Sequence, residues 1–244
     1  MLVRGKVFAT IDLSDAYLQI GVCDQSRKYL TIHTHKGLFN FNRLAPGIRS
    51  APGIFQRIVD QLVAGLPDVV DYFDDICVAG EDEHDLLHKV REVLRRIRSF
   101  GFHIKAEKCQ FFLEEVKFLG NIINKDGIHT DPGKTSAIRN MPPPTDEATL
   151  RSYLGSITHY SRYIKGMSNL TAPLSHLLKK GVNWKWTKEC QASFDKFKEI
   201  LQSPLALTHY LPDMPLEVAA DASSIAIGAQ ISHVFPDGSR KAIG

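Results

Sequence analysis

The fold of this chain is decided by the stretch Val69-Val70-Asp71-Tyr72-Phe73-Asp74-Asp75-Ile76-Cys77-Val78. Its flanks are apolar and rich in β-formers, and two carboxylates stand side by side in the middle. Neighbouring side chains of a strand point to opposite faces, so two adjacent acids indicate a tight turn between two strands. Two interpretations stay open: an ordinary hairpin turn, where Asp is common, and a cation site that relieves the repulsion.

The composition is typical of a soluble globular protein. Of its residues, 43% are hydrophobic and 23% are charged. The length of 244 residues is enough for two or three subdomains. The sequence contains neither an apolar run of roughly 18 residues nor a signal-peptide hydrophobic region. The four cysteines are widely spaced, which argues against a zinc site or a disulfide framework. We therefore expect an intracellular protein, cytoplasmic or nuclear, with no membrane partner.

The basic excess is confined to the middle of the chain. Residues 132–200 hold 11 Lys and Arg against 5 Asp and Glu, whereas the whole chain has a net charge of only +3. Such a segment attracts a phosphate backbone. A solvated helix face is the commoner cause of a mild excess, so charge alone does not decide.

The hydrophobic pattern predicts mixed strands and helices before residue 131 and a helical segment after it. Helices are expected at 51–63 and 83–99, and strands at 6–13, 28–44 (with a turn), 116–123 and 127–130. Asp131 and Thr145 are predicted helix caps. A new strand ends at Asp221. The pattern predicts an α+β fold in three parts, 1–131, 132–204 and 205–244.

Three acids, Asp12, Asp74 and Asp75, each lie at the end or the turn of a β-run. They converge only if the two runs are neighbours in one sheet, which spacing cannot show. Convergent carboxylates suit Mg²⁺, and two such ions about 4 Å apart would clamp the oxygens of a phosphoryl transfer. The residues alone predict a candidate divalent-metal phosphoryl-transfer site.

Five motifs, in order, resemble those of reverse transcriptases. They are Phe8–Ile20 (first catalytic motif), Phe41–Gln56 (second motif), Tyr72–Asp75 (the Tyr-x-Asp-Asp box), Gly101–Cys109 (fourth motif) and Phe118–Gly120 (primer grip). The sequences of these motifs are most similar to those in the Pol polyproteins of gypsy-type long-terminal-repeat retrotransposons. The resemblance implies a polymerase palm, an antiparallel sheet with helices on one face. A helical thumb or connection and the start of a ribonuclease H-like α/β domain would follow.

The resemblance also implies roles for single residues. Asp12, Asp74 and Asp75 would hold two Mg²⁺ ions, for which Mn²⁺ can substitute, with the Leu13 carbonyl as a further ligand. Lys108 would protonate the leaving pyrophosphate, unless it is a plain surface lysine.

Other positions would bind the substrates. Tyr17 falls at the family's steric gate against ribonucleotides, with a core aromatic as the alternative. Pro46, Gly47 and Gln56 would lie near the nucleotide and templating base. Phe118, Leu119 and Gly120 would form the primer grip, and the basic helices would contact the primer–template backbone without reading sequence.

Two features depart from the family pattern. Ala45-Pro46 stands where members usually carry Pro followed by a bulkier residue, and the fingers segment before the first motif is missing. Asp221 would be the first ribonuclease H metal ligand, while the remaining acids of that domain would lie beyond Gly244. We expect no ribonuclease H activity from this chain by itself.

The predicted function is RNA-directed DNA polymerisation within a retroelement Pol polyprotein. The partners would be a primed RNA or DNA template, dNTPs and other segments of the polyprotein. A non-catalytic nucleic-acid-binding relic, or a fragment too incomplete to polymerise, is the alternative from another class. An unrelated Mg²⁺ phosphohydrolase is a third.

Overall fold

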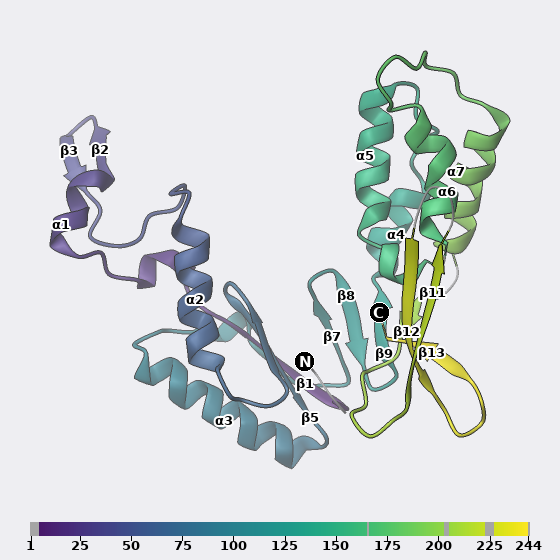
Figure 1. The fold of residues 1–244 in the computed structure, drawn as a ribbon. Coiled ribbons are helices and arrows are strands. Elements are labelled where there is room, and N and C mark those ends of the chain that lie inside the picture. Colours follow the sequence, from purple (N-terminus) through teal and green to yellow (C-terminus); the bar gives the residue numbers. More distant parts are fainter. Residues whose placement is uncertain (1–4, 165, 203–204, 223–226, 244) are drawn as a thin grey trace. The chain divides into compact units, whose positions relative to one another are not determined.

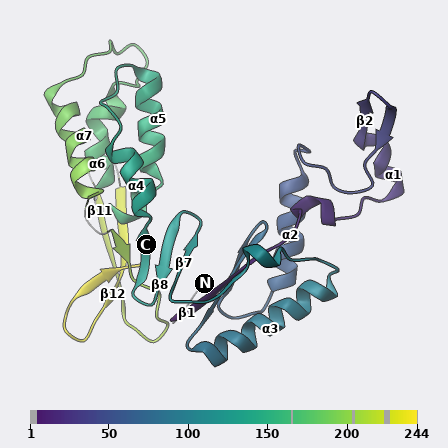
Figure 2. The same ribbon diagram turned by 180° about the vertical axis from the view of Figure 1, so that it is seen from behind.

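The computed structural model describes residues 5–164, 166–202, 205–222 and 227–243, with the side chain of Asp221 left out. The chain divides into two compact units, Met1–Val116 and Lys117–Gly244, and each is described by itself (Figures 1 and 2). Among the described residues, no helix combines the length and the apolar character needed to cross a membrane.

The first unit is built on a four-stranded antiparallel sheet. Its strands are β1 (Val7–Asp12), β4 (Val69–Tyr72), β5 (Asp75–Gly80) and β6 (Gln110–Leu113), in the order β4-β5-β1-β6. The β1–β5 register runs from the pair Val7 and Gly80 to the pair Asp12 and Asp75. Strand β6 was not predicted. It has only four residues and pairs with β1 from far along the chain.

Two helices, α2 (Ala51–Val63) and α3 (Glu83–Ser99), pack on one face of this sheet (Figure 1). Helix α3 has the predicted bounds. Asp82 caps its N-terminus by accepting a hydrogen bond from the Asp85 amide, and Gly101, with φ of 75°, follows its end. The shared core is apolar and almost fully buried, with Ile11, Phe55, Val59, Ile76, Val78 and Val93 among its members. The α+β palm prediction is confirmed.

The remaining elements of the first unit are short. They are η1 (Ala16–Gln19), α1 (Asp24–Arg27), η2 (Lys28–Leu30), β2 (Thr31–Thr34), β3 (Gly37–Asn40) and η3 (Ala106–Lys108). Strands β2 and β3 form the predicted hairpin, which starts later than expected because the chain is 3₁₀-helical through Leu30. The hairpin stands away from the four-stranded sheet in both ribbon views (Figures 1 and 2).

The second unit combines helices with two sheets. Strands β7 (Glu115–Phe118), β8 (Asn121–Asn124), β9 (Gly127–Thr130) and β10 (Ala206–Leu207) form one sheet, in the order β10-β9-β8-β7. The helices are α4 (Pro132–Arg139), α5 (Glu147–Thr158), η4 (Ser161–Tyr163), α6 (Met167–His176) and α7 (Lys188–Ile200). Helices α5, α6 and α7 lie side by side in both ribbon views and enclose a buried cluster that contains Leu150, Tyr153 and Phe194.

The C-terminal strands are β11 (Leu216–Ala222), β12 (Ile227–Val234) and β13 (Arg240–Ala242). They form an antiparallel sheet in that order, which agrees with the predicted strand at 216–221 and with the start of a third strand. Several apolar side chains on it are exposed, including Val218 and Ile227.

The cap of helix α5 was predicted at the wrong residue. The N-cap is Asp146, not Thr145: the Asp146 carboxylate accepts a hydrogen bond of 2.8 Å from the Thr149 amide. The Thr149 hydroxyl in turn accepts from the Asp146 amide at 3.2 Å, which completes a capping box. A box that started at Thr145 would need Ala148 as the reciprocal partner, and alanine has no acceptor.

The corrected cap predicts a difference between two neighbouring alanine variants. Asp146→Ala should lower the free energy of unfolding of the helical cluster by about 1 kcal/mol, whereas Thr145→Ala should cost clearly less. The chain's two tryptophans, Trp184 and Trp186, both pack on this cluster, so their fluorescence during urea denaturation reports its unfolding. An equal or larger loss in Thr145→Ala would contradict the assignment.

Candidate active site

The β4–β5 hairpin brings the three predicted carboxylates to one end of the first sheet. Asp12 is the last residue of β1 and lies opposite Asp75, the first residue of β5. Asp74 lies in the two-residue turn between β4 and β5, and its carbonyl accepts a 2.9 Å hydrogen bond from the Leu13 amide. Residues directly opposite in an antiparallel pair project to the same face, so Asp12 and Asp75 are neighbours.

The pKa of Asp75 is shifted by its surroundings at this end of the sheet. Its pKa is raised above the ordinary value, first by partial removal from water and then by the negative charges of Asp74 and Asp12. The positive charge of Lys108 acts in the opposite direction. A further cation would therefore be favoured at this end of the sheet.

Lys108 reaches the site because the segment after Gly101 runs beside the end of β1. The Ser14 amide donates to the His103 carbonyl and the Lys105 amide donates to the Asp12 carbonyl. This places the Lys108 ammonium 3.2 Å from Asp12 Oδ2. The Asp12 hydrogen bond and charge raise the pKa of Lys108, so the exposed ammonium keeps its proton at neutral pH.

The donor chemistry fits a hard divalent cation held by few protein ligands. Within the described parts of the chain, no group of three or more His, Cys, Asp or Glu side chains is arranged to hold a metal ion. Mg²⁺ commonly uses one or two carboxylates and completes its shell with water and substrate phosphates. The adjacent oxygen donors on Asp12 and Asp75 suit such an ion, and so does the raised pKa of Asp75, which partial removal from water and then the neighbouring charges produce.

The predicted nucleotide-binding residues come from three elements. Tyr17 lies on η1, half-buried, with its ring edge-on to Phe55 of α2 at a centroid distance of 5.3 Å. Pro46 and Gly47 lie exposed in the loop between β3 and α2, and Gly47 has φ of 88°, a conformation that favours glycine. Gln56 lies on α2, and its side chain contacts the backbone of the turn that carries Asp74.

The predicted primer grip is the β7–β8 turn of the second unit. Phe118 ends β7, and the turn residues Leu119 and Gly120 have φ of 49° and 79°. The side chain of Asn121 fixes this turn. Its nitrogen Nδ2 donates to the Leu119 carbonyl at 3.1 Å, and its oxygen Oδ1 accepts from the Tyr163 hydroxyl at 2.8 Å. The predicted ribonuclease H ligand Asp221 lies in β11, and its side chain is outside the described part of the structure.

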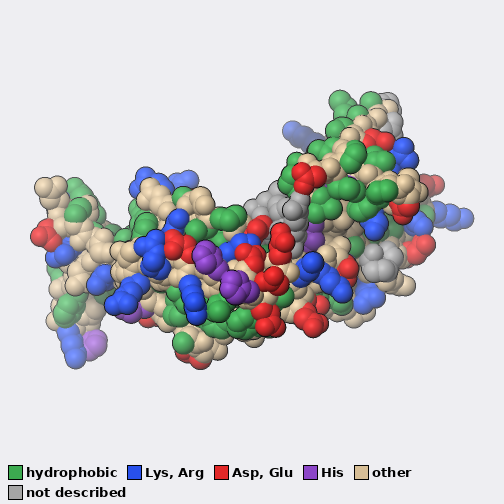
Figure 3. Space-filling view, turned by 90° about the horizontal axis from the view of Figure 1, so that it is seen from below, with side chains coloured by type: hydrophobic (Ala, Val, Ile, Leu, Met, Phe, Trp, Pro, Cys, Tyr) green, Lys and Arg blue, Asp and Glu red, His purple; other side chains and the backbone are tan. Residues whose placement is uncertain are grey.

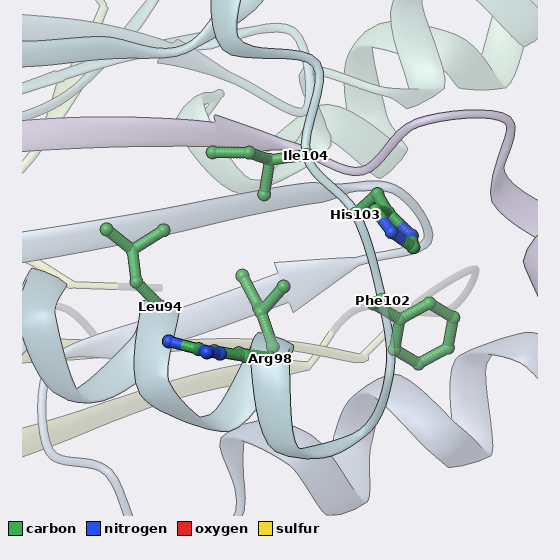
Figure 4. A pocket seen from close by; sticks show the side chains of 6 residues that line it. Leu94, Arg98, Phe102, His103 and Ile104 are labelled. Atoms are coloured by element: carbon green, nitrogen blue, oxygen red, sulfur yellow. The ribbon is translucent and has the colours of Figure 1, made fainter.

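A groove of about 310 Å³ lies on the first unit, between the end of α3 and the segment after Gly101 (Figure 4). Leu94, Ile97 and Arg98 of α3 line it together with Phe102, His103 and Ile104. No carboxylate is among these lining residues, so the groove is separate from the acidic site. The surface seen from below intersperses basic, acidic and histidine side chains (Figure 3).

An antiparallel sheet with helices on one face, and paired carboxylates at the sheet's end, defines a polymerase palm. The comparison with known families agrees. Residues 2–123 match the family described as "Reverse transcriptase (RNA-dependent DNA polymerase)", and residues 186–244 match the "RNase H-like domain found in reverse transcriptase". The chain belongs to the reverse transcriptase family.

Similar proteins come from retroelements and retroviruses. The chain is 34% identical over 235 residues to the "Retrovirus-related Pol polyprotein from transposon 412" of Drosophila melanogaster, which covers 95% of this chain and 19% of that protein. It thus spans about a fifth of that relative's length. Structures of the foamy viral protease-reverse transcriptase superpose on 99% of the chain at 25% identity. The TM-score is 0.87 for a complex with double-stranded DNA (43% of that chain) and 0.82 for one with an RNA/DNA hybrid (33% of that chain).

The electrostatics of the site predict opposite shifts for two variants. Lys108→Met should raise the pKa of Asp75 further because it removes the one opposing charge, whereas Asp12→Asn should lower it because it removes a repelling carboxylate. Carboxyl ¹³C NMR titration without divalent cations measures both shifts. Shifts in the same direction would contradict the described arrangement of charges.

Proposed function

We propose that this chain is the polymerase part of a retroelement Pol polyprotein and catalyses RNA-directed DNA synthesis. The observation that carries the proposal is the β1–β5 register, which sets Asp12 opposite Asp75 beside the turn that holds Asp74. The family match, which covers residues 2–123 and therefore both β1 and β5, supports it.

The site residues would divide the work as follows. Asp12, Asp74 and Asp75, with the Leu13 carbonyl, would hold two Mg²⁺ or Mn²⁺ ions, whose chemistry there is the neutralisation of phosphate charge during nucleotidyl transfer. The paired strands would keep the carboxylates in fixed positions while the primer 3′-hydroxyl gives its proton to solvent water, its oxygen bonds to the α-phosphorus and the bond to pyrophosphate breaks. Lys108, protonated and next to Asp12, would give its proton to the leaving pyrophosphate.

Substrate binding would use both units. Tyr17, Pro46 and Gly47 would face the incoming nucleotide and the templating base, and Phe118–Gly120 the primer. The basic segment at 132–200 would contact the phosphate backbone without sequence preference. The structural neighbours supply a parallel, since they were solved with double-stranded DNA and with an RNA/DNA hybrid. The proposal divides the chain into three functional parts. They are a palm (1–131), a thumb or connection (132–204) and a partial ribonuclease H domain (205–244, with Asp221).

Primer extension tests the catalytic proposal directly. With Mg²⁺, poly(rA)/oligo(dT) and dTTP, the chain should extend the primer, and Asp74→Asn should reduce the rate by roughly a thousandfold because a charge that would hold the ion is lost. No incorporation by the wild type, or equal rates for both proteins, would favour a non-catalytic relic. Phosphate release without extension would indicate a phosphohydrolase.

The steric-gate proposal for Tyr17 is tested by its two ring variants. Tyr17→Ala should raise the ratio of rNTP to dNTP incorporation by roughly tenfold or more, because the ring is the proposed barrier to a 2′-hydroxyl. Tyr17→Phe keeps the ring and its packing on Phe55, so it should leave the ratio nearly unchanged. An unchanged ratio in Tyr17→Ala would mean that Tyr17 is a core aromatic and nothing more.

A further inference from the structure

The side chain of Gln56 joins helix α2 to the catalytic turn. Its oxygen accepts a hydrogen bond of 2.8 Å from the backbone amide of Phe73, the residue directly before Asp74. Its nitrogen donates to Asp60 Oδ1, one helical turn further along α2, and to Asp71 Oδ2 of β4, both at 2.7 Å. The nitrogen and the oxygen of the carboxamide therefore both have partners, on α2 itself, on β4 and in the β4–β5 turn.

The two carboxylates fix which way this amide faces. As carboxylates, Asp60 and Asp71 can accept only from the NH₂ end of this amide, so its oxygen is left facing the Phe73 amide. The raised pKa of Asp71, about 6, reflects partial burial and the nearby charge of Asp60, which agrees with two acids close to one donor. Glutamate at this position would supply the acceptor for Phe73 but would add a third carboxylate. Methionine would match the length and supply neither function.

The turn needs such a contact because its backbone is strained. Phe73 has φ of 54°, in the left-handed region that bulky residues rarely adopt. Primed hairpin turns require a positive φ at this position, which is why glycine or asparagine is usual there. A phenylalanine that is held in this conformation can relax and carry Asp74 with it unless its amide is held.

We infer that Gln56 is a positioning residue, which holds Phe73 in its left-handed conformation and thereby sets the backbone that carries Asp74 and Asp75. The inference rests on the proposed polymerase function for its kinetic consequence, but not for its structural one. It differs from the nucleotide-binding role that the family resemblance implies for Gln56, because all three polar contacts of the side chain are internal.

Hydrogen exchange of the Phe73 amide tests the contact without any activity. In the full chain, Gln56→Met should speed exchange at Phe73 by roughly tenfold or more, the factor expected for one hydrogen bond to the backbone. The matched control is Gln191→Met. Gln191 of α7 likewise donates to an aspartate four residues on, Asp195, and accepts from Trp186, so the chemical change is the same. The control should leave exchange at Phe73 unchanged.

Steady-state kinetics then separates positioning from nucleotide binding. Gln56→Met should lower kcat about tenfold and change the KM for dTTP less than about twofold, because the affected groups act in the transition state. Gln56→Glu should behave similarly above neutral pH. It should recover toward wild type as the pH falls, since a protonated carboxyl again offers one donor and one acceptor.

Several results would overturn the inference: unchanged exchange at Phe73 in Gln56→Met, a raised KM with kcat retained, or a Gln56→Glu to wild-type ratio that is flat with pH. If the wild type itself incorporates no nucleotide, the polymerase proposal fails. The exchange of Phe73 in Gln56→Met against Gln191→Met still decides the role of Gln56.

Discussion

The pairing of β1 with β5 is the interaction on which the first unit depends, and it ends on two carboxylates that face each other. Two unit charges about 5 Å apart repel by at most about 3 kcal/mol at an effective dielectric constant of 20, and by less here because Asp75 is exposed to water. Each fully buried Ile, Val or Phe contributes roughly 1.5–3 kcal/mol. The same two strands bury Phe8, Ile11, Ile76 and Val78, so the core offsets the repulsion several times over.

The repulsion is confined to the end of the sheet by the order of residues along the strands. Apart from Thr10 and the glycine at the far end, apolar side chains occupy the register up to the pair Ile11 and Ile76, and the acids follow in the next pair. A shift of the register by one residue would move every side chain of one strand to the other face. The core that specifies the register thus also specifies which carboxylates meet. The core can therefore hold together residues whose own interactions are unfavourable.

Local patterns in the sequence predicted much of the fold, and long-range contacts account for what they missed. Helix α3 was predicted with its observed bounds because its apolar stripe and the Gly101 that follows its end are both local signals. Strand β6 was missed because four residues carry little periodicity and its partner β1 is distant in sequence. The meeting of Asp12 with Asp75 was likewise expected through family resemblance rather than spacing. For Gln56 only the Asp60 contact is local; the contact with Phe73 spans 17 residues and a helix-to-sheet junction.

The two units solve one conformational problem in the same way. In each, a bulky residue occupies the left-handed region in a tight turn: Phe73 in the β4–β5 turn and Leu119 in the β7–β8 turn. Such a residue costs on the order of 1–3 kcal/mol, more than a single hydrogen bond of about 1 kcal/mol returns, so strand pairing must supply the rest. An amide side chain then ties each turn to another element. Gln56 holds the Phe73 amide from α2, and Asn121 holds the Leu119 carbonyl while it accepts from Tyr163 of η4. A glycine would relieve the strain in either turn, but it would remove the side chain and free the backbone. A bulky residue whose turn is held by an amide side chain keeps both its own side chain and a single backbone conformation, and both turns lie in motifs for which we propose contacts with substrate.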